Sequence, residues 1–191
     1  MLPPHALHVV CWNVAGWRST FARVGENHRS LGAFLRRHAV DVLCLQEVKL
    51  NDATLLEEAT RFGAKAPEGE WEAFFALSQS KKWENGVATF ARRGLVTRAS
   101  KVLGGKDAAF DAVGRFLETD HGAFVIINVY VHNDGEDAVN VPAKMEFLLR
   151  VRERLMELRA AGRRTMLVGD LNAKIRLQDV LPEFIHVHVP R

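Results

Sequence analysis

Three short apolar runs in this sequence each end in polar side chains that can bind an anion or a metal ion. Asn13 follows the run HVVCW, and Glu47 follows the run DVLCLQ. Asp170 and Asn172 follow the run TMLVG. Such runs are typical of buried strands, and ligands often bind where the strands of an open α/β sheet end. We therefore expect these four side chains to converge on one site.

The residue types at these positions suit the cleavage of a phosphodiester. Mg²⁺ prefers oxygen ligands, and one or two carboxylates usually hold it together with substrate phosphate. Glu47 suits a direct metal ligand, and Asp170 suits a group that orients or deprotonates an attacking water. Asn13 and Asn172 are neutral, so they can hydrogen-bond phosphate or water without repelling an anion.

Each of these residues also has an ordinary structural interpretation. A Glu after a strand is commonly a surface residue, an Asn at a strand end commonly forms a turn, and Gly-Asp often opens one. Lys49 could be a solvated surface lysine, and Tyr130, at the end of an apolar strand, could be a core residue. Trp17 and Trp83 could stack on DNA bases, although packing is the commoner role. The prediction therefore depends on several such segments occurring together in one order.

The elements that must position these residues are strands interleaved with a few helices. Apolar periodicity predicts helices over residues 30–39, 52–62 and 143–161. β-rich apolar runs predict strands over residues 7–14, 41–46, 71–77, 87–91, 115–119, 124–131 and 165–168. The alternation of strands and helices indicates an α/β layered domain with a mixed sheet or a sandwich at its centre.

Composition places the chain among intracellular globular proteins. Of its 191 residues, 48% are hydrophobic and 26% are charged, and the net charge is +3. A mildly basic chain agrees with a polyanionic partner. We expect no membrane association, because no run approaches the ~20 apolar residues that a membrane helix needs, and the N-terminal residues do not resemble a secretory signal. Cys11 and Cys44 lie in hydrophobic runs, so we expect both to be reduced core residues.

Taken together, the segments resemble the exonuclease III type of abasic-site (AP) endonuclease. The run WNVAGWR is similar to that family's W-N-x-x-G-x-R, and DVLCLQEVK is similar to its D-x-x-x-L-Q-E-x-K. GVA at residue 86, GR at residue 114 and NVYVHN at residue 128 resemble G-V-A/G and the block G-R … N-x-Y-x-P-N. GDLN at residue 169 matches G-D-F/L-N. These matches occur in the family's order from residue 8 to residue 172.

The resemblance implies an endonuclease/exonuclease/phosphatase (DNase I-like) fold, in which two mixed β-sheets flanked by helices pack as a sandwich. We expect residues 1–191 to form a single truncated domain of this kind, incomplete at its C-terminus. The resemblance also implies that Glu47 holds Mg²⁺, for which Mn²⁺ can substitute. By the same resemblance, Asn13 supports the metal and contacts the substrate phosphate.

The remaining roles also come from the resemblance. Tyr130 and Asn133 would hydrogen-bond the scissile phosphate, and Asp170 and Asn172 would position the nucleophilic water. The expected substrate is duplex DNA with an abasic site, cut on the 5′ side in base excision repair to leave a 3′-hydroxyl. The expected location is the nucleus or another DNA-containing compartment.

The sequence departs from the family's pattern in three ways. Ala15 stands where the family usually has Asp or Asn, and His132 stands where the block usually has Pro. The family's terminal S-D-H does not occur in the 191 residues. His186 and His188 lie in an alternating tail, but neither has an adjacent Asp. We do not expect either of them to replace the missing histidine.

Two alternatives to an AP endonuclease stay open at this point. The domain could be a catalytically incomplete module that binds nucleic acid or protein. It could also be a phosphatase or another nuclease of the same superfamily.

Overall fold

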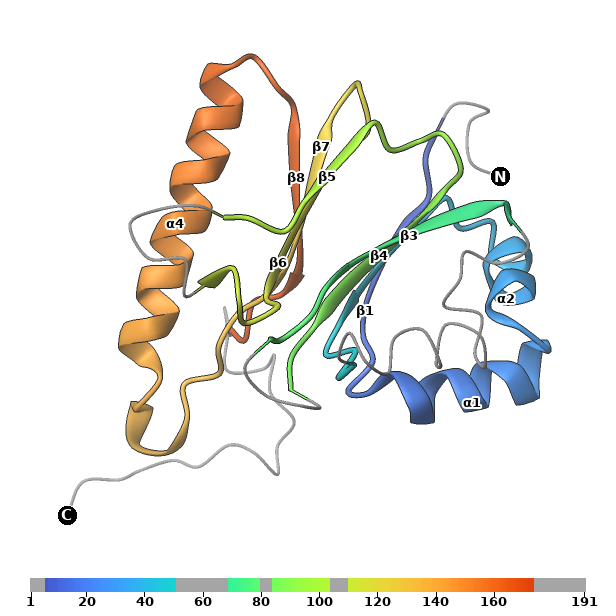
Figure 1. Cartoon of the computed structure of the whole chain (residues 1–191), viewed down its shortest axis with the longest axis horizontal. Coiled ribbons are helices and arrows are strands. Elements are labelled where there is room, and N and C mark those ends of the chain that lie inside the picture. Colours follow the sequence, from blue (N-terminus) through green and yellow to red (C-terminus); the bar gives the residue numbers. More distant parts are fainter. Residues whose placement is uncertain (1–5, 51–68, 80–83, 104–109, 174–191) are drawn as a thin grey trace.

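A computed structural model of the chain describes residues 6–50, 69–79, 84–103 and 110–173 (Figure 1). The first half of the chain forms a four-stranded mixed sheet in the order β1-β2-β4-β3. β2 is parallel to β1 and antiparallel to β4, and β4 is antiparallel to β3. These strands are β1 (Val9–Asn13), β2 (Val42–Gln46), β3 (Trp71–Ala76) and β4 (Val87–Arg92).

The second half of the described chain forms another four-stranded mixed sheet, in the order β5-β6-β7-β8. β7 is parallel to β8 and antiparallel to β6. The strands are β5 (Arg98–Ser100), β6 (Phe116–Asp120), β7 (Val125–Tyr130) and β8 (Thr165–Asp170). Two mixed sheets with helices on their outer sides confirm the predicted fold class (Figure 1).

Two helices cover the outer side of the first sheet. In α1 (Trp17–His28), Trp17, Phe21 and Val24 are buried at helical spacing and pack on that sheet. In α2 (Leu31–Arg37), the Ser30 hydroxyl accepts a hydrogen bond from the backbone N–H of Ala33 at 3.1 Å and so caps the first turn. The helix α2 was predicted and α1 was not, although Trp17, Phe21 and Val24 recur at helical spacing in the sequence.

The outer side of the second sheet is covered by α4 (Val141–Ala160), which follows the short 3-10 helix η3 (Glu136–Ala138). Pro142 lies in the first turn of α4, where its missing N–H would have no helical partner. Phe147, Val151 and Leu158 are buried against the second sheet. Their spacing is the apolar stripe from which the helix over 143–161 was predicted.

A buried polar pair joins the two sheets in the core between them. The Gln46 side chain at the end of β2 donates to Asn128 Oδ1 in β7 at 2.7 Å. The Asn128 amide in turn donates to the carbonyls of Leu45 at 3.2 Å and Ala88 at 3.0 Å. Breaking this pair would leave buried polar groups unsatisfied, so it fixes how β2 and β7 lie relative to each other. The residues that follow these strands carry the predicted site.

The structure corrects the expectation for one cysteine. Cys44 is buried and free, as predicted, whereas Cys11 is free but exposed. β1 and β8 are the end strands of their sheets among the described residues, so the side chain of Cys11 is only partly covered. Burial raises the pKa of both thiols, that of Cys44 to about 12.

The predicted strands are all present with ends shifted by at most two residues, and β5 was not predicted. The helix predicted over 52–62 and the alternating tail with His186 and His188 lie outside the described residues. No helix in the part of the chain that the structure describes is long and apolar enough to span a membrane.

Candidate active site

The side chain of Asn13 links two carboxylates that are distant in the sequence. Its Nδ2 atom donates to Glu47 Oε1 at 2.9 Å and to Asp170 Oδ2 at 2.7 Å. The Asn13 Oδ1 atom accepts from the backbone N–H of Ala15 at 2.9 Å, which fixes the orientation of the amide. The three strand ends that were predicted to converge therefore meet at one point.

Strand register explains this convergence. β1 and β2 are parallel and pair Asn13 with Gln46, so Glu47 follows at the same edge of the first sheet. β7 and β8 are parallel and pair Tyr130 with Asp170 at the corresponding edge of the second sheet. The carboxyl ends of all four strands thus lie on one side of the sandwich.

Glu47 is held by three hydrogen-bond donors. Besides Asn13, Lys49 Nζ lies 3.0 Å from Glu47 Oε2, and the hydroxyl of Tyr130 donates to the same carboxylate. Burial alone would raise the pKa of Glu47, but these donors outweigh it and the pKa is lowered. The backbone of Glu47 has a φ of 53°, an uncommon left-handed conformation for a residue with a side chain. A carboxylate held ionised in this way, with its side chain still 18% exposed, suits cation binding.

Tyr130 lies between this carboxylate and a guanidinium group. Arg115 Cζ is 4.6 Å from the centroid of the Tyr130 ring, and Arg115 Nη1 donates to the Tyr130 carbonyl at 3.0 Å. Burial and the hydrogen bond to Glu47 raise the pKa of Tyr130 to about 12. The phenol therefore stays protonated at neutral pH and remains a hydrogen-bond donor.

Asp170 is fixed through both of its carboxylate oxygens. Oδ2 accepts from Asn13, and Oδ1 accepts from the backbone N–H of Asn172 at 2.9 Å. The Asn172 amide donates to the carbonyl of Val131 at 2.8 Å, so its own orientation is fixed as well. Gly169 is required just before Asp170, because a Cβ atom there would lie 2.0 Å from the carbonyl oxygen of Val129.

A cavity of about 520 Å³ opens beside Glu47 and Tyr130. Asn133, the remaining predicted phosphate ligand, lines it, and its Oδ1 accepts from the Asn140 side chain at 3.1 Å. The structure thus gathers all six predicted site residues in or next to this cavity. Its lining consists of Glu47, Lys49, Glu84, Asn85, Arg115, Tyr130, His132, Asn133 and Asn140.

The lining includes residues to which the sequence analysis gave no role. Arg115 and His132 were noticed only as parts of a motif, and Glu84, Asn85 and Asn140 were not singled out at all. Arg115 had a usable signal, since it directly follows a glycine at the start of a predicted strand. No comparable signal marked the other four, because they reach the cavity from loops and from the residue before α4.

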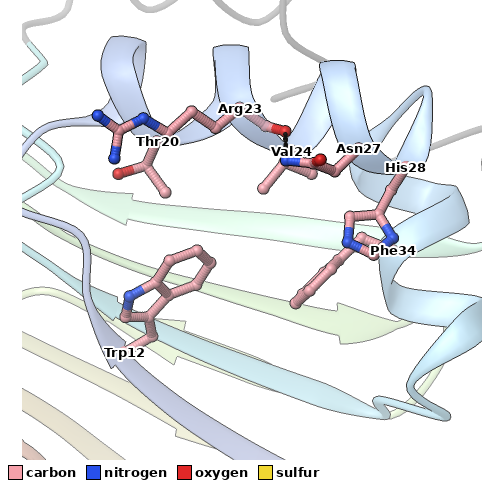
Figure 2. Close-up of a pocket in the computed structure, with 7 residues that line it drawn as sticks. All are labelled: Trp12, Thr20, Arg23, Val24, Asn27, His28 and Phe34. Atoms are coloured by element: carbon pink, nitrogen blue, oxygen red, sulfur yellow. Dashed lines mark hydrogen bonds between the residues drawn. The ribbon is translucent and has the colours of Figure 1, made fainter.

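A second, smaller hollow lies under α1 and is separate from the predicted site. It has a volume of about 240 Å³. Figure 2 shows Trp12 on β1 and Phe34 on α2 facing Arg23, Asn27 and other residues of α1. None of the predicted site residues lines it.

Trp17 has the packing role that was favoured for it over DNA stacking. Trp17 is 1% exposed, and its ring stacks on Phe90 with centroids 5.7 Å apart, so it is a core residue. Trp83 lies outside the described residues. Where the chain is described, no group of three or more His, Cys, Asp or Glu side chains could hold a metal ion. A metal at this site would therefore depend on one or two carboxylates, as Mg²⁺ sites commonly do.

The sequence over residues 10–181 matches the model of the Endonuclease/Exonuclease/phosphatase family. The chain belongs to this family. Among relatives, DNA-(apurinic or apyrimidinic site) endonuclease 2 of Bos taurus is 27% identical over 208 residues, covering 89% of this chain and 39% of the bovine protein. Recombination repair protein 1 of Drosophila melanogaster is 28% identical over 166 residues, covering 87% of this chain and 22% of the Drosophila protein. The chain thus spans less than half the length of these two relatives.

Solved structures of the Endonuclease/Exonuclease/phosphatase family have the same architecture. The AP endonuclease LMAP from Leishmania major superposes with a TM-score of 0.71 at 26% identity, covering 93% of this chain and 59% of that one. The catalytic domain of Xenopus laevis APE2 superposes with a TM-score of 0.69 at 23% identity, covering 88% and 59%. At 23% identity, the likeness to the Xenopus laevis domain shows the fold alone.

Proposed function

We propose that this chain carries the catalytic site of a Mg²⁺-dependent phosphodiesterase that cuts duplex DNA on the 5′ side of an abasic site. The observation that carries the proposal is the Asn13 amide, which joins Asp170 to Glu47, a residue that lines a polar cavity. The AP endonuclease relatives support the substrate class. The role implies a DNA-containing intracellular compartment.

The residues present fit Mg²⁺, and Mn²⁺ as a substitute. Glu47 would hold the ion, with Asn13 supporting the carboxylate and Asp170 close by. The site offers oxygen donors with access to water, which is what Mg²⁺ requires. A bound Mg²⁺ would neutralise negative charge on the phosphate. Lys49 forms an ion pair with Glu47 and so neutralises part of the negative charge of that carboxylate.

The cavity lining suits a phosphodiester. Lys49 and Arg115 contribute positive charge, and both complement a phosphate anion. Asn133 supplies a neutral amide donor at the same wall, and the Tyr130 hydroxyl would donate to phosphate once its hydrogen turns away from Glu47. These groups are fixed before substrate arrives, so little reorganisation would accompany binding.

Asp170 is the residue best placed to orient or deprotonate the attacking water. Hydrogen bonds from Asn13 and from the backbone of Asn172 hold its carboxylate in one orientation. Each carboxylate oxygen has further lone pairs that could accept from water. The fixed geometry supports a positioning role for Asn172 as well.

The test is incision of a DNA duplex that contains a tetrahydrofuran abasic analogue, with Mg²⁺ and with EDTA. We expect incision only with Mg²⁺, and a 3′-hydroxyl product that a DNA polymerase can extend. Glu47→Gln and Asp170→Asn should each lower the rate by about a hundredfold or more. Glu146→Gln is the matched control, because it makes the same kind of change on the exposed face of α4.

A folded chain that leaves the duplex intact, while Glu47→Gln behaves like the parent, would overturn the enzymatic proposal. Binding to abasic duplex that weakens steeply with salt, without incision, would instead identify a non-catalytic binding module. Cleavage of a lipid phosphate or of RNA in preference to abasic DNA would assign a different substrate to the same site.

A further inference from the structure

His132 lies two residues beyond the end of β7, in the wall of the site cavity between Tyr130 and Asn133 in sequence. Its ring packs edge-on against Phe147 of α4, with centroids 5.9 Å apart and planes at 74°. Its Nδ1 atom is buried and has no hydrogen-bond partner among the described residues. One nitrogen of the ring is therefore enclosed by the protein.

The other ring nitrogen of His132, Nε2, has no hydrogen-bond partner among the residues that the structure describes. Nε2 is not among the buried, unpaired atoms of the described residues, and no hydrogen bond to it is formed there. The ring lines a cavity that also contains Arg115. Because Nδ1 is enclosed, a polar contact between this ring and a ligand in the cavity would be made through Nε2.

The protonation state of His132 follows from its surroundings. Burial, together with the positive charge of Arg115, lowers the pKa of His132 to about 4, so the ring is neutral at neutral pH. A neutral ring carries one proton, on Nδ1 or on Nε2. An enclosed N–H without an acceptor is rarer in proteins than an enclosed, unpaired acceptor. The proton therefore belongs on Nε2.

His121 provides an internal comparison at the opposite end of β7. It too is half-buried, has a lowered pKa and a buried, unpaired Nδ1, and stacks on Phe124 with centroids 5.0 Å apart. Its Nε2, however, is hydrogen-bonded to Thr119 Oγ1 at 2.9 Å. An enclosed Nδ1 is thus compatible with a purely structural histidine. What distinguishes His132 is its place in the wall of a cavity that also contains Arg115, with no described residue hydrogen-bonded to its Nε2.

We propose that His132 binds the substrate phosphate, its neutral imidazole donating the Nε2 hydrogen to a non-bridging phosphate oxygen. This inference rests on the proposed function and adds a substrate contact to it. The donor is uncharged, so it does not repel the neighbouring Arg115. The proline that usually occupies this position in the family the sequence resembles has no such donor.

The first measurement follows the ring itself. The full-length chain is labelled with ¹⁵N-histidine and titrated with dimethyl phosphate in EDTA at pH 7. We expect His132 to show the Nε2–H tautomer and its Nε2 resonance to shift on addition of the probe, while His121 does not shift. An Nδ1–H tautomer, or a His132 signal indifferent to the probe, would overturn the inference.

The second measurement compares the affinity of variants for uncleaved tetrahydrofuran-containing duplex in Ca²⁺. His132→Phe keeps the ring packing on Phe147 and removes the donor, so its Kd should rise about tenfold to a hundredfold. His132→Gln keeps a donor and should retain most of the affinity. His121→Phe removes the same groups outside the cavity and should bind like the parent.

These outcomes separate the inference from the proposed function. Unchanged affinity in His132→Phe, in a chain that incises abasic DNA, would remove only the role of His132. A chain that cuts no DNA but whose His132 signal responds to dimethyl phosphate would keep the phosphate contact and remove the endonuclease. Should His132→Phe fail to fold by circular dichroism, a His132→Ala variant that binds like the parent would overturn the inference just as well.

Discussion

Asn13 Nδ2 and Asp170 Oδ2 lie 2.7 Å apart although 157 positions separate the two residues in the sequence. They end β1 and β8, the end strands of two different sheets. The hydrogen bond forms only when the two sheets pack in their native arrangement. It is therefore a direct indicator of a correctly assembled site.

The Asn13 amide is expected to be the least replaceable neutral group of the site. Asn13→Asp removes two donated hydrogen bonds and places a third carboxylate beside Glu47 and Asp170. We expect it to destabilise the fold by about 1–3 kcal/mol in urea unfolding and to lower incision by about a hundredfold. Asn27→Asp, on the exposed face of α1, is the control. Equal effects of the two changes would refute a special role for Asn13.

Tyr130 is the single tyrosine of the chain, so its ionisation can be followed by absorbance without interference from another phenol. A rapid jump to alkaline pH in EDTA should give a midpoint near the pKa of about 12. Glu47→Gln should lower that pKa, because it removes a negative charge and a carboxylate acceptor. Arg115→Met should raise it, because the guanidinium stabilises the phenolate. Shifts of the same sign in both variants would contradict the observed arrangement.

Gly169 places the backbone of β8 against β7 and so positions Asp170. Gly169→Ala should lower the free energy of unfolding by about 3 kcal/mol or more. The added Cβ would collide with the Val129 carbonyl, and a φ of +137° at this position disfavours any side chain. Gly25→Ala in α1 has nothing within 4 Å of the added atom and should stabilise by about 0.5–1 kcal/mol. Urea unfolding of both variants tests the contrast. A neutral Gly169→Ala would show that β8 can move without penalty.

His132 should make the fold acid-sensitive above the range in which carboxylates titrate. Its pKa is about 4 in the folded protein and about 6.5 when unfolded, so the unfolded chain binds the extra proton first. The stability that this histidine contributes is present above pH 6.5 and is lost as the pH falls from about 6.5 to about 4. One proton changes the free energy of unfolding by at most about 1.4 kcal/mol per pH unit.

His132→Phe should remove that contribution, so its free energy of unfolding should fall less between pH 7 and pH 5 than that of the parent. Urea unfolding at a series of pH values measures the slope. Parallel slopes for the parent and His132→Phe would mean that the ring is already protonated at pH 5.

The sequence by itself determined the fold class and the residues at the strand ends. Apolar runs with polar termini are local features, and the direction of a strand decides at which edge of the sheet its last residue lies. Asn13, Glu47 and Asp170 could therefore be assigned to one site without coordinates. The burial of Trp17 was also indicated by its residue type, because tryptophan is more often a packing residue than a surface one.

Only the tertiary structure decided which other side chains reach that site. Arg115 lies over the Tyr130 ring, and His132 packs on Phe147, because two sheets and α4 bring together residues with no common sequence pattern. The exposure of Cys11 likewise depends on β1 lying at the end of its sheet. Burial, charge and hydrogen bonding at a site are sums over neighbours, and the identity of those neighbours is set by packing rather than by local spacing.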